Sequence, residues 1–84
     1  MKIKDGFAMK TIMDRNVLTA PKDVFNGMIT LNDTASFIFS NLAKGQTPEE
    51  IVKTVANHFD VSEEKARDDV QEFCAAMLSL GVFE

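Results

Sequence analysis

The sequence predicts an α+β fold in which a three-stranded antiparallel sheet is followed by three helices, an outline that resembles a winged helix-turn-helix. Two observations carry this prediction. Up to about residue 31, short apolar runs are separated by turn residues. Beyond that point, apolar residues recur at helical spacing between clear start and stop signals. The 84 residues suffice for one hydrophobic core, so we expect a single domain over residues 1–84.

The strand half covers about residues 7–31. A turn is expected at residues 14–16, because Asp and Asn bond their own backbone and tolerate unusual φ angles. Pro21 ends the second run because it cannot donate to a strand ladder. Asn26 and Gly27 form the strongest turn signal of the chain. The expected strands are Phe7–Met13, Asn16–Ala20 and Met28–Leu31.

The helices are expected at about residues 33–43, 48–59 and 63–80. The second has the clearest start, since Thr47 as N-cap, Pro48 at the first position and Glu50 at the third form a capping box. Gly45 and Gly81 are stop signals. Buried stripes are expected at Ala35, Ile38, Phe39 and Leu42, at Ile51, Val52, Val55, Ala56 and Phe59, and at Ala66, Val70, Phe73, Met77 and Leu80.

Residues for catalysis or cofactor binding do not form a recognisable pattern. The chain has one histidine, His58, and one cysteine, Cys74, whereas a zinc site needs three or four such ligands. Cys74 falls within an apolar helix face, where burial raises the pKa of a thiol and makes it inert. Glycine-rich phosphate-binding motifs are absent. We therefore expect no enzyme, no metal and no cofactor.

Charge argues against nucleic acid and membrane surfaces as partners. The net charge is −4, and the segment from Glu63 to Leu80 carries five acidic and two basic residues, a net charge of −3. A recognition helix of that charge would be repelled by DNA phosphates. No apolar run approaches the roughly 18 residues of a membrane span, and the first residues lack the apolar region of a secretory signal. A cytoplasmic protein is the expectation.

An open sheet edge is the feature that suggests a function. Backbone groups at an edge strand can pair with another chain, while pockets for its side chains give specificity. The third strand, Met28, Ile29, Thr30 and Leu31, leads directly into the helices. The third helix carries, beside its core stripe, a mixed second stripe at Arg67, Gln71, Cys74 and Leu78. This stripe either lines a peptide groove or widens the core contact. The same edge could also pair with a second copy and form a homodimer.

Three motifs, taken in order, resemble the PqqD family, whose fold is also called the RiPP recognition element. The first is Leu31-Asn32-Asp33-Thr34-Ala35, and the second is Thr47-x-Glu49-Glu50-Ile51. The third comprises Ala66, Asp69, Val70, Phe73, Leu80 and Gly81. The resemblance spans about residues 7–83. Phe39 stands where many relatives carry tryptophan, and the strand half matches the quinone-pathway members poorly.

The resemblance implies a peptide chaperone that is not an enzyme. Family members bind the leader of a ribosomally synthesised precursor peptide as an added strand and present it to a modifying enzyme, often a radical S-adenosylmethionine (SAM) protein. Carried over by position, the groove involves Met28, Ile29, Thr30 and Leu31. The residues expected to face the strand are Arg67, Gln71, Cys74 and Leu78. They are chosen from helix geometry, since the family motif marks mainly the core side of this helix. The alternatives are a winged-helix protein–protein docking subunit without a peptide ligand, a DNA-binding regulator, and an enzyme of unrecognised type.

Overall fold

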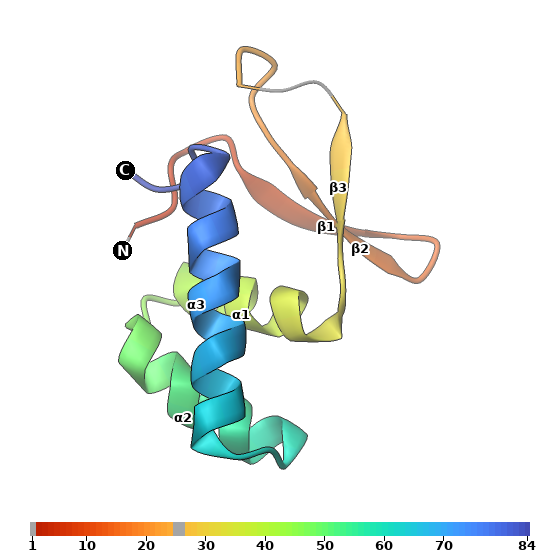
Figure 1. The fold of residues 1–84 in the computed structure, drawn as a ribbon. Helices are drawn as coiled ribbons and strands as arrows, with labels where there is room; N and C mark the ends of the chain where they lie inside the picture. Colours follow the sequence, from red (N-terminus) through yellow and green to blue (C-terminus); the bar gives the residue numbers. More distant parts are fainter. Residues whose placement is uncertain (1, 25–26) are drawn as a thin grey trace.

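The computed structural model of the chain describes residues 2–24 and 27–84. Three antiparallel strands precede three helices (Figure 1), which confirms the predicted fold class. In chain order the elements are β1 (Ala8–Ile12), β2 (Arg15–Thr19), β3 (Met28–Leu31), α1 (Asp33–Ala43), α2 (Pro48–Phe59) and α3 (Glu63–Ser79). None of the helices in the described ranges is long and apolar enough to cross a membrane.

The sheet has the order β1-β2-β3, so β3 is an edge strand. Met13 and Asp14 connect β1 to β2, with φ angles of 49° and 67°. Two left-handed residues in a two-residue loop make a type I′ turn, whose twist matches that of the flanking strands. The predicted turn at residues 14–16 is therefore wrong by one residue, and β2 begins at Arg15. Of the predicted turn Asn26-Gly27, Asn26 lies outside the described residues.

Each helix begins with a side chain that caps free backbone N–H groups. Asn32 accepts from the Ala35 N–H at 2.8 Å at the start of α1. Thr47 and Glu50 form the predicted capping box at α2, and Ser62 caps α3. At the end of α2, Asp60 adopts the left-handed conformation with φ 53°. This turn leads within two residues into the cap of α3, so α2 and α3 form a close pair.

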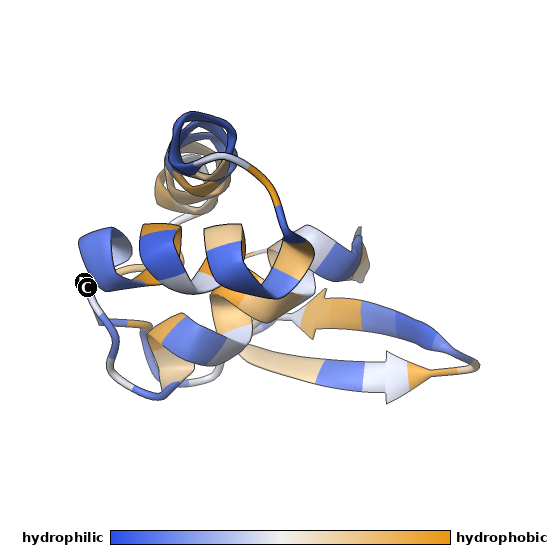
Figure 2. Ribbon diagram, turned by 90° about the horizontal axis from the view of Figure 1, so that it is seen from below, coloured by the Kyte–Doolittle hydropathy of each residue, from blue (hydrophilic) through white to orange (hydrophobic). Residues whose placement is uncertain are grey.

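The core lies between the helices and one face of the sheet. Four residues of the predicted α3 stripe, Ala66, Val70, Phe73 and Met77, are buried, whereas the fifth, Leu80, follows the end of the helix and is half-buried. Figure 2, in which α3 is seen nearly end-on, shows its hydrophilic side facing away from the rest of the molecule. The largest side chains with less than 2% exposure are Leu18, Ile38, Ile51, Val55, Val70 and Val82.

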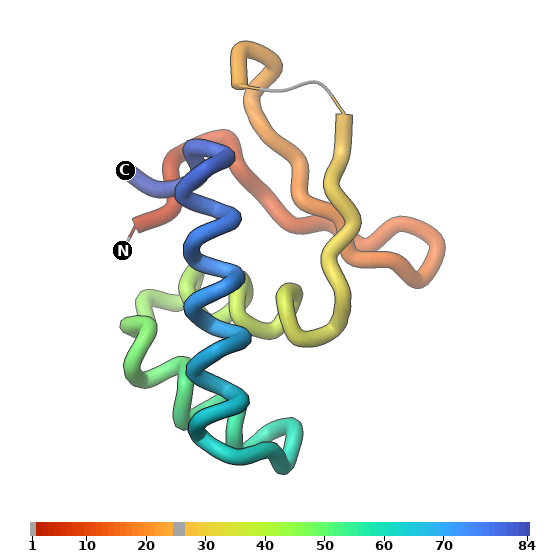
Figure 3. Tube along the Cα trace, in the orientation of Figure 1, coloured from red at the N-terminus to blue at the C-terminus, as the bar shows by residue number. Residues whose placement is uncertain are grey.

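The two ends of the chain are joined by backbone pairing. Ile3 and Phe83 form an antiparallel bridge, and the Lys4 N–H donates to the Val82 carbonyl at 2.7 Å. Figure 3 shows the first and last segments running next to each other at one end of α3. The segment after α3 thus closes over the core, with Val82 and Phe83 both buried.

Replacing Thr47 with alanine should lower the free energy of unfolding by about 1 kcal/mol, because the α2 cap is lost. In a chain of this size that corresponds to a fall of about 4–8 °C in Tm. Thr47→Ser keeps the capping oxygen and should stay near wild type. Thermal unfolding followed by circular dichroism measures both, and equal stability of the alanine variant would contradict the role of the cap.

Candidate functional site

The junction between β3 and α1 fixes the position of the sheet edge relative to the helices. The Asn32 side chain caps α1, and the Ser36 hydroxyl donates to the Asn32 carbonyl at 2.8 Å. Ser36 is buried, so if this bond were lost, no water could replace it as a partner of the hydroxyl group. The chain therefore turns sharply from the edge strand into α1 with little freedom.

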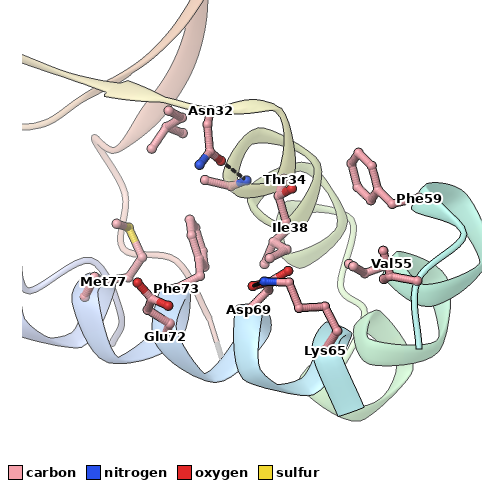
Figure 4. A pocket seen from close by; sticks show the side chains of 14 residues that line it. Asn32, Thr34, Ile38, Val55, Phe59, Lys65, Asp69, Glu72, Phe73 and Met77 are labelled. Atoms are coloured by element: carbon pink, nitrogen blue, oxygen red, sulfur yellow. Dashed lines mark hydrogen bonds and ion pairs between the residues drawn. The ribbon is translucent and has the colours of Figure 1, made fainter. Parts of the chain in front are cut away.

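A cleft with a volume of about 610 Å³ opens beside this junction. Buried side chains form its floor, among them Ile38 of α1, Val55 of α2, and Phe73 and Met77 of α3. Leu31, the last residue of β3, also lines it. Figure 4 shows Phe73 projecting from α3 toward α1. The size and the apolar lining suit one or two side chains of a ligand.

Charged side chains of α3 stand along the cleft. Lys65 donates to Asp69 at 2.8 Å, and Figure 4 shows the ends of these two side chains meeting beside α3. This hydrogen bond, with the attraction of the carboxylate, raises the pKa of Lys65. Glu72 also lines the cleft and is exposed. Within residues 2–24 and 27–84, Glu72 forms no ion pair.

The register of the sheet shows which backbone groups of β3 are open. In a two-residue type I′ hairpin the flanking residues Ile12 and Arg15 are a hydrogen-bonded pair, and such pairs alternate along the strands. The groups of Asn16 and Leu18 then point toward β3, where their partners are Leu31 and Ile29. It follows that the N–H and C=O groups of Met28 and Thr30 point to the open edge.

The four strand residues predicted for the site lie on this edge. Met28 is 59% exposed, Thr30 is exposed, and Ile29 is half-buried against the core. Leu31 is buried and lines the cleft. The structure therefore brings the open backbone edge and the mouth of the cleft together at the end of β3.

The four helix residues predicted opposite the strand do not line the cleft. Arg67 bonds Glu49 of α2, Cys74 is buried in the core, Gln71 is exposed, and Leu78 is 59% exposed. With 100° per residue, their stripe runs along one flank of the core stripe, and the cleft lies along the other flank. The core stripe has two flanks, and its periodicity does not say which of them faces β3.

The cleft flank of α3 consists of Lys65, Asp69, Glu72 and Ala76. These residues were missed by the sequence analysis although their spacings of four, three and four are those of one helix face. The spacing of Lys65 and Asp69 indicates that both lie on one helix face, because oppositely charged residues four apart pair on a helix surface. Three of the four, Lys65, Asp69 and Glu72, are charged, and charged residues on a helix usually form a solvent-exposed face.

The single histidine and the single cysteine of the chain lie in different surroundings. Burial raises the pKa of the Cys74 thiol, which disfavours the reactive thiolate. His58 is exposed in the last turn of α2 and stacks on Phe37, with ring centroids 4.2 Å apart. Over the described ranges, no group of three or more His, Cys, Asp or Glu is placed to hold a metal ion. The cleft offers apolar contact, carboxylates and an adjacent strand edge.

Comparison with known proteins gives a consistent result. The family described as "Coenzyme PQQ synthesis protein D (PqqD)" matches residues 15–82. A solved structure, "TbiB1 in Complex with the TbiA(beta) Leader Peptide", is similar with a TM-score of 0.85 and 28% sequence identity. The match covers 100% of this chain and 95% of that chain. Among curated proteins, none matches this sequence.

The Arg67–Glu49 pair predicts a pH dependence of stability. The hydrogen bond and the charge of Arg67 lower the pKa of Glu49 below its usual range. A carboxylate whose pKa is lowered by folding stabilises the protein above its unfolded pKa of about 4.3, and this contribution is lost as the pH falls. The urea midpoint of wild type should therefore exceed that of Glu49→Gln at pH 7, and the gap should shrink toward pH 3.

The matched control is the same substitution in an Arg67→Gln background. There Glu49→Gln should produce no pH-dependent difference, because its partner is already missing. A gap of the same size at pH 7 and pH 3, or one that persists without Arg67, would contradict this assignment. The pair is exposed, so the gap itself is expected to be small.

Proposed function

This chain belongs to the PqqD family, and from that premise we propose that it is a non-catalytic chaperone for the leader of a ribosomally synthesised precursor peptide. It binds the leader by β-strand addition and presents it to a modifying enzyme. The observation that carries the proposal is the open edge of β3, which leads directly into an apolar cleft. The likeness to a structure titled as a leader-peptide complex supports it.

The backbone of β3 supplies the first part of the interaction. Met28 and Thr30 direct their N–H and C=O groups away from β2, so an incoming peptide strand has four backbone groups to pair with. These bonds do not depend on the sequence of the peptide. They fix its direction and register, which is the role of the backbone in strand addition.

The cleft supplies the second part. A peptide paired with β3 projects alternate side chains to one side, and Leu31 places the cleft at the end of that strand. A large apolar side chain can enter and cover Phe73 and Met77. Ala76 on the rim is small and exposed, which keeps the entrance wide. The strand residues Met28, Ile29, Thr30 and Leu31 and the cleft flank of α3 thus form one binding surface.

The enzyme that receives the peptide is proposed to be a radical SAM protein, as is frequent among relatives of this fold. The protein works in the cytoplasm, where a ribosomal precursor is made, and carries no cofactor of its own. In the absence of a leader, the open β3 edge can pair with the same edge of a second copy, and a homodimer would then compete with the peptide.

Binding should be reversible and of moderate strength. A disordered leader loses conformational freedom when it pairs with β3, and only the remaining free energy contributes to affinity. We expect a dissociation constant on the order of 1 μM, about −8 kcal/mol. Such an affinity lets the leader transfer to an enzyme after recognition.

Replacing Thr30 with proline should abolish leader binding, because proline lacks the outward N–H and its ring would meet the incoming strand. The sheet should remain, since the Thr30 N–H does not bond β2. Thr30→Ala keeps the N–H and should bind like wild type. Isothermal titration with the N-terminal half of any short precursor reading frame found beside this gene measures all three, and full binding by the proline variant would rule out pairing along β3.

Filling the cleft entrance tests the contribution of α3. Ala76→Phe places a ring in the rim and should weaken leader binding at least about 10-fold, the loss of one good apolar contact. Ala75→Phe is the matched control, because Ala75 is also exposed on the same helix but does not line the cleft. If the Ala75 variant loses affinity while the Ala76 variant keeps it, the peptide lies on another face of α3.

A further inference from the structure

The cleft has an uneven charge that its apolar floor does not explain. Three ionisable side chains line it: Lys65, Asp69 and Glu72. Lys65 and Asp69 neutralise one another through their 2.8 Å contact. Glu72 is exposed at the rim, and in the described part of the chain it forms no ion pair, although its charge contributes to the raised pKa of Lys65. The lining therefore carries one uncompensated negative charge at neutral pH.

Glu72 stands where a bound peptide would pass. It precedes Phe73 of the cleft floor and lies one helical turn, about 6 Å, before Ala76 of the entrance. In an extended peptide, side chains two residues apart point the same way and are separated by about 6.7 Å. When one apolar side chain fills the cleft beside Phe73, the side chain two residues away therefore lies within reach of the rim of α3.

A basic side chain suits that position better than an acidic or apolar one. The stem of lysine or arginine can lie along apolar surface such as Ala76 while its charged end stays in water. There it meets the Glu72 carboxylate, whereas an acidic side chain would be repelled by Glu72. The net charge of −4 on the chain adds an attraction for a cationic peptide during encounter.

Building on the proposed function, we propose that Glu72 is a specificity-determining residue that selects leader segments carrying lysine or arginine two residues from a large apolar anchor. The apolar anchor fills the cleft and the β3 edge pairs with the backbone. Glu72 discriminates among peptides that satisfy both. The pair is solvent-exposed, so its effect is a preference of about 2- to 5-fold in Kd and not an absolute requirement.

The test uses a phage library of random twelve-residue peptides selected against the full chain. Peptides selected by wild type should be enriched in lysine or arginine two residues from a large apolar residue. Glu72→Gln should select the same apolar anchors without that enrichment, and Glu72→Lys should favour aspartate or glutamate instead. Glu64→Gln is the matched control, because it removes an exposed acid of the same helix outside the cleft. It should select like wild type.

Titration gives the size of the effect. One selected peptide and its version with glutamine in place of the basic residue should differ about 2- to 5-fold in Kd for wild type, and bind Glu72→Gln equally. Peptides with apolar anchors but no basic enrichment, or enrichment that persists in Glu72→Gln, overturn the role of Glu72 and leave leader binding standing. A wild-type chain that selects no peptide overturns leader binding and the role of Glu72 together.

Discussion

The turn from β3 into α1 at Asn32 is the constraint on which the proposed site depends. Asn32 caps the helix with its side chain, and its carbonyl accepts from the buried Ser36 hydroxyl. The Ser36 hydroxyl also lies 3.5 Å from the carbonyl of Leu31, the last residue of β3, so the first turn of α1 is held against the end of the strand beside the cleft. Were the turn loose, the strand edge and the apolar cleft would be two unrelated features. Because it is fixed, a peptide can use both without rearrangement of the protein, which lowers the free energy cost of binding.

One face of helix α3 packs into the core, and the adjacent face lines the cleft. Phe73 and Met77 are buried in the core and also form the cleft floor. The cleft thus lies directly over the core, with Leu31 of β3 and the cleft flank of α3 among its lining residues. Residues on its rim, such as Ala76 and Glu72, are exposed and free to vary without loss of packing. In the proposed function, stability and specificity therefore depend on different positions of one helix.

Much of the fold was predictable because local signals and periodicity agreed. The capping box of Thr47 and Glu50, and the apolar stripe of α3, specified elements that the structure contains. The hairpin turn was placed one residue late because Met13 has no turn preference. It adopts a left-handed φ because the twist of β1 and β2 demands a type I′ turn.

The site was predictable in part, for a geometric reason. Strand residues are tied to an edge by their order in the chain, so Met28–Leu31 could be placed at an edge before the structure was known. Which flank of α3 faces that edge depends on how α1 and α2 orient the helix. Arg67 illustrates this: its partner Glu49 lies 18 residues earlier on α2, and this contact marks the Arg67 flank as the one that faces α2. No local pattern in α3 contains that information.

Leader binding along β3 and the cleft can be mapped by chemical shifts, with an isotope-labelled chain and the unlabelled N-terminal half of any short precursor reading frame found beside its gene. Strand addition next to the cleft predicts shifts that concentrate on Met28–Leu31 and on Lys65, Asp69, Glu72 and Ala76. Shifts confined to Gln71 and Leu78, on the other flank, would contradict the proposed cleft. An absence of shifts at β3 would contradict strand addition itself.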